Sequence, residues 1–358
     1  MRIGLISDGN LRNAATPAEK IHQILDEAAL AEEHGYHCWG TSETHFSGPY
    51  TSITAPDAIY GAVAERTSRI QIRWMAMVIT YVHPVQVAER LMTLDAVTNG
   101  RAGLCTARGN NINTVKTFNV DFEHSRPMWE ESMRIIGQAL QHERIDYDGT
   151  YWQLDDIPIL PRPVQDPPPE LLVVSSGTET HELAAKLGIG VISSDNYLGW
   201  DALDVRIAAY RDNFASAEPV SSRPTEVFSY YVASAHCAET RARALNEIST
   251  RAFEFVDFLL DDLYAPLRKK PSYEYMEQIE AVHEYRRDLD KLMTIGPSIV
   301  AGDPDDVTAT LKKLEERGVD EVILSIDGIS HEKHMKAIDL IGKHVLPEFH
   351  RATVEVPG

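Results

Sequence analysis

Short apolar segments rich in β-branched residues alternate along this chain with longer segments whose apolar residues recur at helical spacing. The clearest unit runs from Ile70 to Asn110 and contains a strand-like segment, a helical segment and a second strand-like segment. Pro84 suits the first turn of the helix, and Gly100 suits the position after its last turn. The apolar residues that recur along this helix are Val87, Leu91, Leu94 and Val97. The pattern predicts two parallel strands joined by a helix, with Arg108 in the loop beyond.

The same alternation continues along the chain. The segments that favour strands are 3–7, 36–41, 70–79, 101–106, 171–174, 190–193, 227–233 and 322–326. A helical pattern follows each of these eight segments, as in a single (β/α)8 TIM barrel spanning residues 1–358. An open, doubly wound sheet is the alternative, because counting strands does not establish that the sheet closes.

Residues 261–296, between strands seven and eight, break the alternation with a charged and aromatic segment. Long insertions at a barrel mouth often control access of solvent, so we expect this segment to be an inserted lid. Its Arg268, Lys269 and Lys270 are expected to be solvated charges rather than substrate ligands.

Composition excludes several classes of protein. Charged residues make up 25% and hydrophobic residues 43% of the 358 residues, as in ordinary globular domains. The formal charge of −20 argues against a nucleic-acid partner, which needs a basic surface. Three widely spaced cysteines, Cys38, Cys105 and Cys237, indicate reduced thiols. Because no signal peptide or membrane span is visible, we expect a cytoplasmic protein with no membrane partner.

Polar residues gather where the predicted strands end, which is where TIM barrels carry their active sites. They are Asp8, Asn10, Glu43, Thr44, His45, Tyr81, His83, Arg108, Asn110, 175–178, Asp195 and Asn196. The apolar residues expected at the same end are Trp39, Phe46, Trp74, Met75 and Met77. An aromatic and sulfur-rich opening suits a flat organic ligand. The sequence has no HxH or HExxH spacing at these strand ends, which disfavours a metal-dependent hydrolase, and we expect no metal.

The segment Ser175-Ser176-Gly177-Thr178, after the fifth strand, is a candidate anion site. It offers hydroxyl groups and backbone amides at a helix N-terminus, and both attract negative charge. For this segment alone an ordinary helix cap is the alternative. Arg108 and Arg126, taken singly, would equally suit surface ion pairs.

Several ordered and separated segments form a set of motifs. They are AEEHGYHCWGTSETHF (31–46), HPVQVAERLMTLDAVTNGRAGLCTARGN (83–110), Ser125-Arg126, PRPVQDPPPELLVVSSGTETHELAAKLG (161–188), GDPDDVTATLKKLEERGVDEVIL (302–324) and HEKHMKAIDLIGKHVLPEF (331–349). Together they resemble the bacterial luciferase-like monooxygenases, which are flavin-dependent, two-component enzymes. The resemblance spans nearly the whole chain except a variable region at about 194–296.

The resemblance implies a TIM barrel that binds FMN. The residues it implies as ligands of the FMN phosphate are Arg108, Arg126, Ser176, Gly177 and Thr180. Two guanidinium groups and helix-end amides suit a doubly charged phosphate. It also implies a cis peptide bond between Met75 and Ala76, beside the isoalloxazine ring. Finally, it implies a homodimer formed through the second and third helices. A stripe of small residues lies there: Ala58, Gly61 and Ala62. The alternative is that this stripe only packs on the barrel.

The candidate catalytic residues are Glu43, Thr44 and His45, and here the chain departs from the family. Where the family has the histidine tied to its peroxyflavin chemistry, this chain has Thr44. A threonine hydroxyl can hydrogen-bond a peroxide but does not act as a base near neutral pH. Strand alternation points His45 away from Thr44, so His45 and His83 are more simply structural. Glu43 can anchor a buried network rather than transfer a proton.

The leading functional hypothesis is therefore an FMN-dependent monooxygenase. Reduced FMN (FMNH2) would come from a separate NAD(P)H-dependent flavin reductase and react with O2 to a flavin C4a-(hydro)peroxide that oxygenates a small organic substrate. An F420-dependent hydride-transfer oxidoreductase is one alternative. The arginine pair argues against it, because F420 has no terminal phosphomonoester. A non-catalytic flavin-binding subunit is the other alternative, and Thr44 keeps it open.

Overall fold

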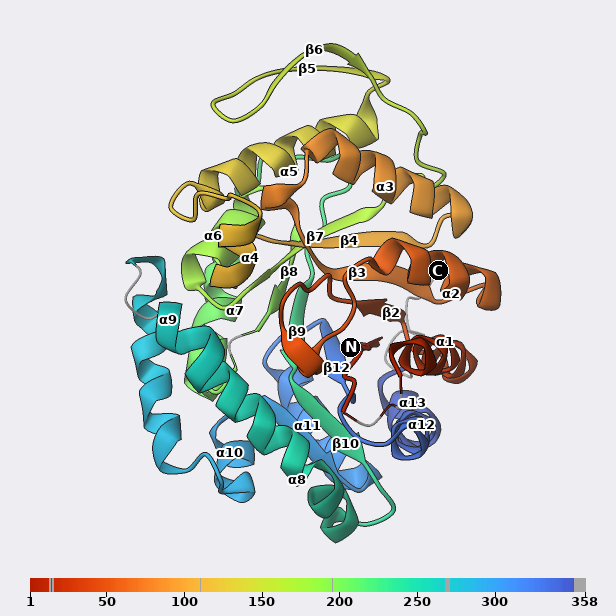
Figure 1. Cartoon of the computed structure of the whole chain (residues 1–358), viewed down its shortest axis with the longest axis vertical. Coiled ribbons are helices and arrows are strands. Elements are labelled where there is room, and N and C mark those ends of the chain that lie inside the picture. Colours follow the sequence, from red (N-terminus) through yellow and green to blue (C-terminus); the bar gives the residue numbers. More distant parts are fainter. Residues whose placement is uncertain (13, 15, 110, 195, 268–270, 351–358) are drawn as a thin grey trace.

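The computed structural model describes residues 1–350 apart from 13, 15, 110, 195 and 268–270, and a closed barrel of eight strands lies at its centre (Figure 1). In chain order the barrel strands are β1 (Arg2–Ile6), β2 (Cys38–Thr41), β3 (Gln71–Val78), β4 (Ala102–Ala107), β7 (Glu170–Ser175), β8 (Gly190–Ser193), β9 (Phe228–Val232) and β12 (Glu321–Ser325). Around the barrel they follow the order β1-β12-β9-β8-β7-β4-β3-β2, and every neighbouring pair is parallel. This closure confirms the predicted TIM barrel and excludes the open, doubly wound sheet.

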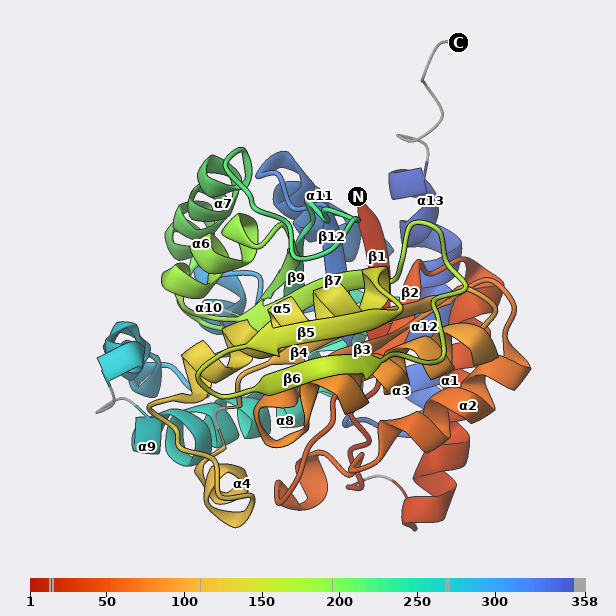
Figure 2. The ribbon, with the colours of Figure 1, turned by 90° about the horizontal axis from the view of Figure 1, so that it is seen from above.

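Helices surround the barrel (Figures 1 and 2). They are α1 (Pro17–His34), α2 (Pro56–Arg66), α3 (Pro84–Val97), α5 (Ser125–Gln141), α6 (Thr178–Lys186), α7 (Trp200–Phe214), α8 (Arg241–Asp257), α11 (Pro304–Glu316) and α12 (His331–Leu340), which continues through η5 (Ile341–Val345) into α13 (Leu346–His350). The first helix shows why the boundaries were predictable. The hydroxyl group of Thr16 accepts a hydrogen bond from the amide of Glu19, and Pro17 occupies the first turn. The helix ends at Gly35, whose φ of 82° favours glycine.

The interior of the barrel is layered along its axis. Near the N-terminal ends of the strands, Arg73 forms ion pairs with Glu321 at 2.6 Å and Glu170 at 3.0 Å. Beyond these ion pairs, toward the C-terminal ends of the strands, the interior becomes apolar. This layer consists of Ile6, Cys38, Met75, Ala76, Cys105, Leu172, Ile192 and Ile323. Charges therefore close one end of the barrel, and an apolar floor separates them from the other end.

Several elements were not predicted. An antiparallel hairpin of β5 (Arg144–Asp148) and β6 (Gln153–Pro158) lies over α5 (Figure 2). The segment after β4 contains the short helix α4 (Ile112–Thr117). A small parallel sheet joins β10 (Ser234–Cys237) to β11 (Ile299–Gly302) outside the barrel.

The segment 261–296, between β9 and β12, is mostly helical where it is described. It contains most of η3 (Phe258–Tyr264), a π-helix, followed by α9 (Ala265–Leu267), η4 (Pro271–Glu284) and α10 (Leu289–Ile295). Arg268, Lys269 and Lys270 lie outside the described residues, so their expected solvation stays a prediction. The segment packs through buried side chains, including Leu267, Met276 and Leu292.

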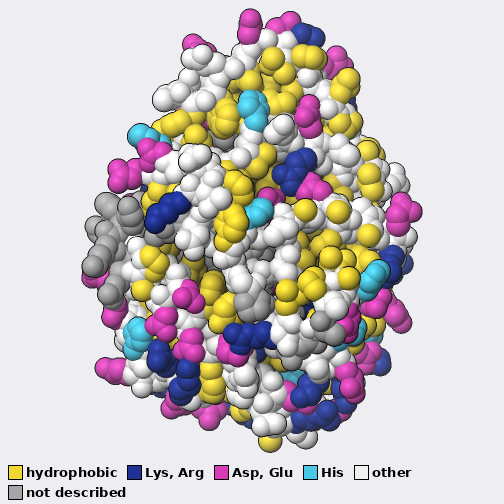
Figure 3. All heavy atoms as spheres, viewed as in Figure 1, with side chains coloured by type: hydrophobic (Ala, Val, Ile, Leu, Met, Phe, Trp, Pro, Cys, Tyr) yellow, Lys and Arg dark blue, Asp and Glu magenta, His cyan; other side chains and the backbone are white. Residues whose placement is uncertain are grey.

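On the face seen in Figure 3, acidic and basic side chains are interspersed between hydrophobic ones. Within the described ranges, no helix is both long enough and apolar enough to cross a lipid bilayer.

Candidate functional site

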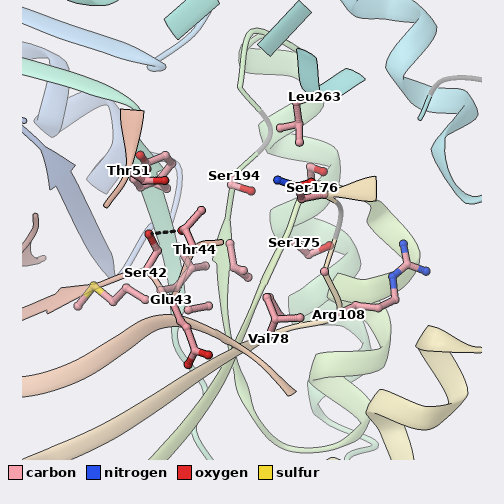
Figure 4. A pocket seen from close by; sticks show the side chains of 18 of the residues that line it. Ser42, Glu43, Thr44, Thr51, Val78, Arg108, Ser175, Ser176, Ser194 and Leu263 are labelled. Carbon is pink, nitrogen blue, oxygen red and sulfur yellow. Dashed lines mark hydrogen bonds between the residues drawn. The ribbon is translucent and has the colours of Figure 1, made fainter. Parts of the chain in front are cut away.

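A cavity of about 350 Å³ opens at the C-terminal ends of the barrel strands. All ten residues predicted for the site line it: Glu43, Thr44, His45, Met75, Ala76, Arg108, Arg126, Ser176, Gly177 and Thr180. The cavity is elongated, with Ser42, Glu43 and Thr44 at one end and Arg108, Ser175 and Ser176 at the other (Figure 4). The structure thus brings the predicted residues together, while their roles in binding and catalysis stay predictions.

The end near Arg108 has the character of an anion site. Arg108 follows β4, beside Gly109, whose φ of 89° bends the chain away from the strand. Arg126 comes from the first turn of α5, and α6 directs its N-terminus to the same end. The N-cap of α6 is Gly177, which has no side chain to bond the amides of the first turn. Positive charge and helix-end amides therefore converge here.

Arg126 is held at this end by one acidic residue. Its Nη1 forms a short ion pair with the carboxylate of Glu179, which lies in the first turn of α6. Its Nε is buried and has no hydrogen-bond partner within the part of the chain that the structure describes. A buried donor without an acceptor is costly, so this nitrogen is a natural ligand for an added anion.

The loop before α6 is supported from behind. The Nε of Arg206 donates to the carbonyl oxygen of Ser176 at 2.8 Å, and the Ser176 hydroxyl lies 2.5 Å from that of Tyr275. His181 lies 2.9 Å through Nδ1 from the Gly177 carbonyl oxygen, and 3.0 Å through Nε2 from the Ser193 hydroxyl. Burial lowers the pKa of His181 to about 3. The neutral ring therefore donates to Gly177 and accepts from Ser193, which fixes the loop without adding charge.

The peptide bond between Met75 and Ala76 is cis, as the resemblance implied, and both residues line the cavity. The carbonyl oxygen of Ala76 accepts a hydrogen bond of 3.0 Å from the amide of Glu43. The floor beside it is apolar, with Ile6, Ile192 and Ile323. These residues give part of the cavity an apolar lining.

At the end away from Arg108, three oxygen-bearing side chains form a continuous series. The hydroxyl oxygens of Thr44 and Ser42 are 3.0 Å apart (Figure 4), and Ser42 Oγ lies 2.9 Å from Asp8 Oδ1. Burial, followed by repulsion from Asp327, raises the pKa of Asp8. Thr44 is therefore connected to a buried carboxyl group rather than standing alone.

Glu43 and His45 belong mainly to the wall of the cavity. The Glu43 carboxylate lies 3.4 Å from Nε2 of His45 and 3.3 Å from Nη2 of Arg90, which also pairs with Asp57. The His45 ring packs 5.1 Å from the ring of Phe118. Glu43 thus takes part in an ion-pair network, and its anchoring role stays a prediction.

His83, the other histidine expected to be structural, accepts a hydrogen bond from the amide of Val85 at the start of α3. Its ring lies 4.8 Å from that of Trp152. It caps a helix and packs against the β5–β6 hairpin.

A family model described as luciferase-like monooxygenase matches residues 1–321. The chain belongs to this family. The cavity at the C-terminal ends of its strands is lined by arginine side chains and by apolar residues.

Relatives of this luciferase-like chain differ in the cofactor that their names state. The oxygenase component of flavin-dependent trigonelline monooxygenase from Acinetobacter baylyi is 21% identical over 355 residues, covering 95% of this chain and 93% of that protein. F420-dependent glucose-6-phosphate dehydrogenase from Amycolatopsis mediterranei is 24% identical over 324 residues, covering 87% and 90%. Protein y4wF of Sinorhizobium fredii is 28% identical over 203 residues, and the match spans 56% of this chain and 57% of y4wF.

The fold has counterparts among solved structures. The monooxygenase RslO1 from Streptomyces bottropensis superposes with a TM-score of 0.79 at 22% identity, covering 98% of this chain and all of the other. At this identity the likeness establishes the shared barrel fold. It does not identify the cofactor or the substrate, which must be inferred from the residues of the cavity.

The apolar opening was predicted incorrectly. Among its expected residues only Met75 lines the cavity. Trp39 and Trp74 are buried outside the barrel, where both rings pack edge-on against Tyr60 of α2. Alternation along a strand explains the error, because residues on either side of an inward-facing position point toward the helices. Met77 is buried in the same outer core, and Phe46 is exposed on the surface.

Other residues of the cavity were not among the predicted site residues, including Ser42, Tyr231, Arg251 and Tyr275. Ser42 directly follows β2, so the strand-end rule that pointed to Asp8 was sufficient to find it. Arg251 lies in the middle of α8, and Tyr275 lies in the segment after it. No local pattern in the sequence marks these two as part of a site.

Proposed function

We propose that the protein is an FMN-dependent monooxygenase that acts on a small organic substrate. The observation that carries the proposal is the pair of guanidinium groups, Arg108 and Arg126, beside the N-terminus of α6. A terminal phosphate carries close to two negative charges, and arginine forks with helix-end amides are well suited to bind it. The buried, unpartnered Nε of Arg126 fits an anion that completes the site.

The rest of the cavity fits the remainder of FMN. Ser176, Gly177 and Thr180 would contact the phosphate, and the Met75–Ala76 wall would lie against the isoalloxazine ring. A Cβ on Gly177 would lie 3.3 Å from the ring of Tyr275, so glycine keeps the approach to the loop open. Bound reduced FMN would supply the electrons that activate O2, and the protein would orient the substrate and exclude water.

The cofactor test uses FMN and riboflavin, which lacks the phosphate. Calorimetric titration is expected to show that Arg108→Gln and Arg126→Gln each weaken FMN binding about tenfold or more, as expected for a lost charge-assisted hydrogen bond. Riboflavin affinity should stay the same. Arg134→Gln is the matched control, because Arg134 lies on the same helix but pairs with Glu130 outside the cavity. Equal losses for FMN and riboflavin would contradict a phosphate site.

The reaction test compares reduced FMN with reduced F420 and follows O2 uptake. The proposal predicts O2 consumption with reduced FMN in the presence of a separate flavin reductase. Substrate reduction by F420 without O2 uptake would instead favour the hydride-transfer alternative. Tight FMN binding without turnover by any reductase would favour a non-catalytic flavin-binding subunit.

We further propose that the segment 261–296 is a lid. Leu263 and Tyr275 line the cavity, and the hydroxyl contact between Tyr275 and Ser176 joins the segment to the loop before α6. Limited proteolysis should cleave this segment more slowly once FMN is bound. Unchanged cleavage would contradict the assignment.

A homodimer through α2 and α3 also stays a proposal. Among the stripe residues Ala58, Gly61 and Ala62, a Cβ on Gly61 would meet no atom within 4 Å in the single chain. That space suits close approach of a second copy. The molar mass in solution by light scattering tests it.

A further inference from the structure

We propose that Asp8 is the proton source for the reaction and acts through the hydroxyl groups of Ser42 and Thr44. The inference rests on the proposed function, because it places the reacting oxygen at the end of the cavity away from the phosphate site. Asp8 is a positioning residue in this scheme, since Thr44 is the group that faces the reacting atoms. The three residues Asp8, Ser42 and Thr44 would together supply a proton where, by resemblance, the family carries a histidine.

The geometry of the series is short and continuous. Asp8 Oδ1 lies 2.9 Å from Ser42 Oγ, and Ser42 Oγ lies 3.0 Å from Thr44 Oγ1, both within hydrogen-bond range. All three residues line the cavity, and Asp8 is 8% exposed. Asp8 follows β1, and the two hydroxyl groups follow β2, which pairs directly with β1. The donor and both hydroxyl groups therefore lie on two loops that follow neighbouring, paired strands.

The protonation state of Asp8 decides which way the hydroxyl groups point. When Asp8 is ionised it accepts from Ser42, so Ser42 accepts from Thr44 and the Thr44 oxygen presents only a lone pair to the cavity. When Asp8 is protonated on Oδ1 it donates to Ser42, which donates to Thr44. The Thr44 hydroxyl then donates into the cavity. A single buried proton thus changes Thr44 from an acceptor to a donor.

The groups around Asp8 favour the protonated form. Burial and the charge of Asp327, after β12, raise its pKa, whereas the Ser42 hydrogen bond and the charge of Arg251, from α8, lower it. Its second oxygen, Oδ2, lies 3.5 Å from the hydroxyl of Tyr231 on β9 and 3.4 Å from that of Ser325 on β12. Burial raises the pKa of Tyr231, which therefore remains a neutral donor. Oδ2 can accept these weak bonds while Oδ1 keeps the proton.

The Asp327 carboxylate is itself held by Lys20, whose Nζ lies 2.9 Å from Oδ1. Burial alone would raise the pKa of Asp327, but the positive charge of Lys20 lowers it, so Asp327 stays charged. A fixed negative charge near Asp8 is therefore built into the fold.

In the proposed transfer, each oxygen atom passes a proton to the next one, starting at Asp8. The Asp8 O–H bond breaks as Ser42 Oγ gains that proton, Ser42 gives its own proton to Thr44, and Thr44 gives its own to an oxygen atom bound in the cavity. Asp8 is left as a carboxylate with one more negative charge, and the acceptor oxygen gains one proton. A proton from solvent restores Asp8 before the next turnover.

The first test uses the protein without cofactor. Carbon-13 NMR of labelled aspartate carboxyl groups, with Asp8 assigned by its loss in Asp8→Asn, should show titration above the ordinary value of 3.8. Ser42→Ala should move this titration to higher pH, because it removes a hydrogen bond that stabilises the carboxylate. Thr44→Val should move it in the same direction by less, and Thr44→Ser should leave it unchanged. Titration at or below 3.8, or no response to Ser42→Ala, would overturn the inference.

The second test uses the protein with reduced FMN. The turnover rate of the wild type should fall as pH rises through the Asp8 titration. Ser42→Ala, Thr44→Val and Asp8→Asn should each lower the rate about a hundredfold, the usual contribution of a positioned proton donor, and abolish that pH dependence. Thr44→Ser should retain both. Unchanged rate and pH profile in Ser42→Ala with FMN bound would overturn the inference and leave the proposed function in place. Failure to bind FMN would overturn the proposed function and, with it, the role of Asp8 in that reaction. The cofactor-free titration would still show whether Asp8, Ser42 and Thr44 are coupled.

Discussion

The two ends of the barrel interior both bury charged side chains, but they pair them differently. At the N-terminal end, Arg73 is fully buried and its terminal nitrogens contact Glu321, Glu170 and Gln71. At the C-terminal end, Arg126 is about one-third exposed, and its partner Glu179 is largely exposed. Asp8, at the same end, is held by hydroxyl groups within hydrogen-bond range.

This difference separates a structural from a functional use of charge. At the N-terminal end of the barrel, here called the base of the barrel, the carboxylates of Glu321 and Glu170 pair with Arg73. The apolar floor separates this ion-pair cluster from the cavity, so a ligand in the cavity cannot reach it. Among the described residues, Nε of Arg73 and Nε of Arg126 both lack a hydrogen-bond partner, but only Arg126 lines the cavity, where a ligand can reach it. Substitutions at the base of the barrel should therefore mainly change the free energy of unfolding, and substitutions at the cavity should mainly change ligand affinity.

The largest effect is expected from Arg73→Met. This change removes the fully buried cation from the carboxylates of Glu321 and Glu170, which keep the more exposed Arg2 and, for Glu170, Arg223. Breaking one partner of a buried pair typically costs about 3–5 kcal/mol. The free energy of unfolding, measured with urea, tests this.

Two controls accompany that measurement. Arg66→Gln removes a pair with Asp26 in which both side chains are exposed, and about 1 kcal/mol or less is expected. Adding Glu321→Gln and Glu170→Gln to Arg73→Met should recover part of the loss, because the stranded charges are gone. A loss for Arg73→Met as small as that for Arg66→Gln would contradict the proposed role of the base.

Both ends were only partly predictable from sequence. The barrel followed from periodicity, since each strand and helix is a local pattern, and β8 has its predicted bounds of 190–193. The small sheet of β10 and β11 did not, because it pairs two four-residue strands that lie far apart in the chain. The β5–β6 hairpin was not predicted, because much of it is exposed and a register shift interrupts the alternation of buried and exposed residues.

The site shows the same limit. Residues at strand ends, such as Thr44 and Arg108, were predictable because closure brings all strand ends to one face. Trp39 and Trp74 were misplaced, because proximity to a strand end does not say which way a side chain points. Arg73 was not noticed at all, since an arginine within a strand has meaning only once Glu321, 248 residues away, is seen beside it.

A smaller effect is expected from pH at the base. Burial would raise the pKa of Glu321, but the positive charge of Arg73 and then of Arg2 lowers it to about 2, below its ordinary value of 4.5. The stabilisation is therefore complete above pH 4.5 and is lost as pH falls toward 2. One pKa unit corresponds to about 1.4 kcal/mol, so roughly 3 kcal/mol is at stake.

Comparison of the wild type with Glu321→Gln isolates this contribution, because other carboxyl groups titrate in both proteins. The difference in unfolding free energy should be constant from pH 7 to pH 5 and should shrink at lower pH. A difference that does not change down to pH 3 would show that Glu321 is not stabilised as a carboxylate.

The smallest effect, at the cavity, is expected from Glu179→Gln, and it should change binding rather than stability. The Glu179 carboxylate competes with a phosphate for Arg126 and repels a dianion. Removing its charge should tighten FMN binding about threefold to tenfold at low salt, and less at high salt. Riboflavin binding should not respond, and the unfolding free energy should change by about 1 kcal/mol or less, since the pair is largely exposed. Weaker FMN binding in this variant would instead mean that Glu179 orients Arg126 for the phosphate, and the cavity would then resemble the base in using a protein carboxylate to fix its cation.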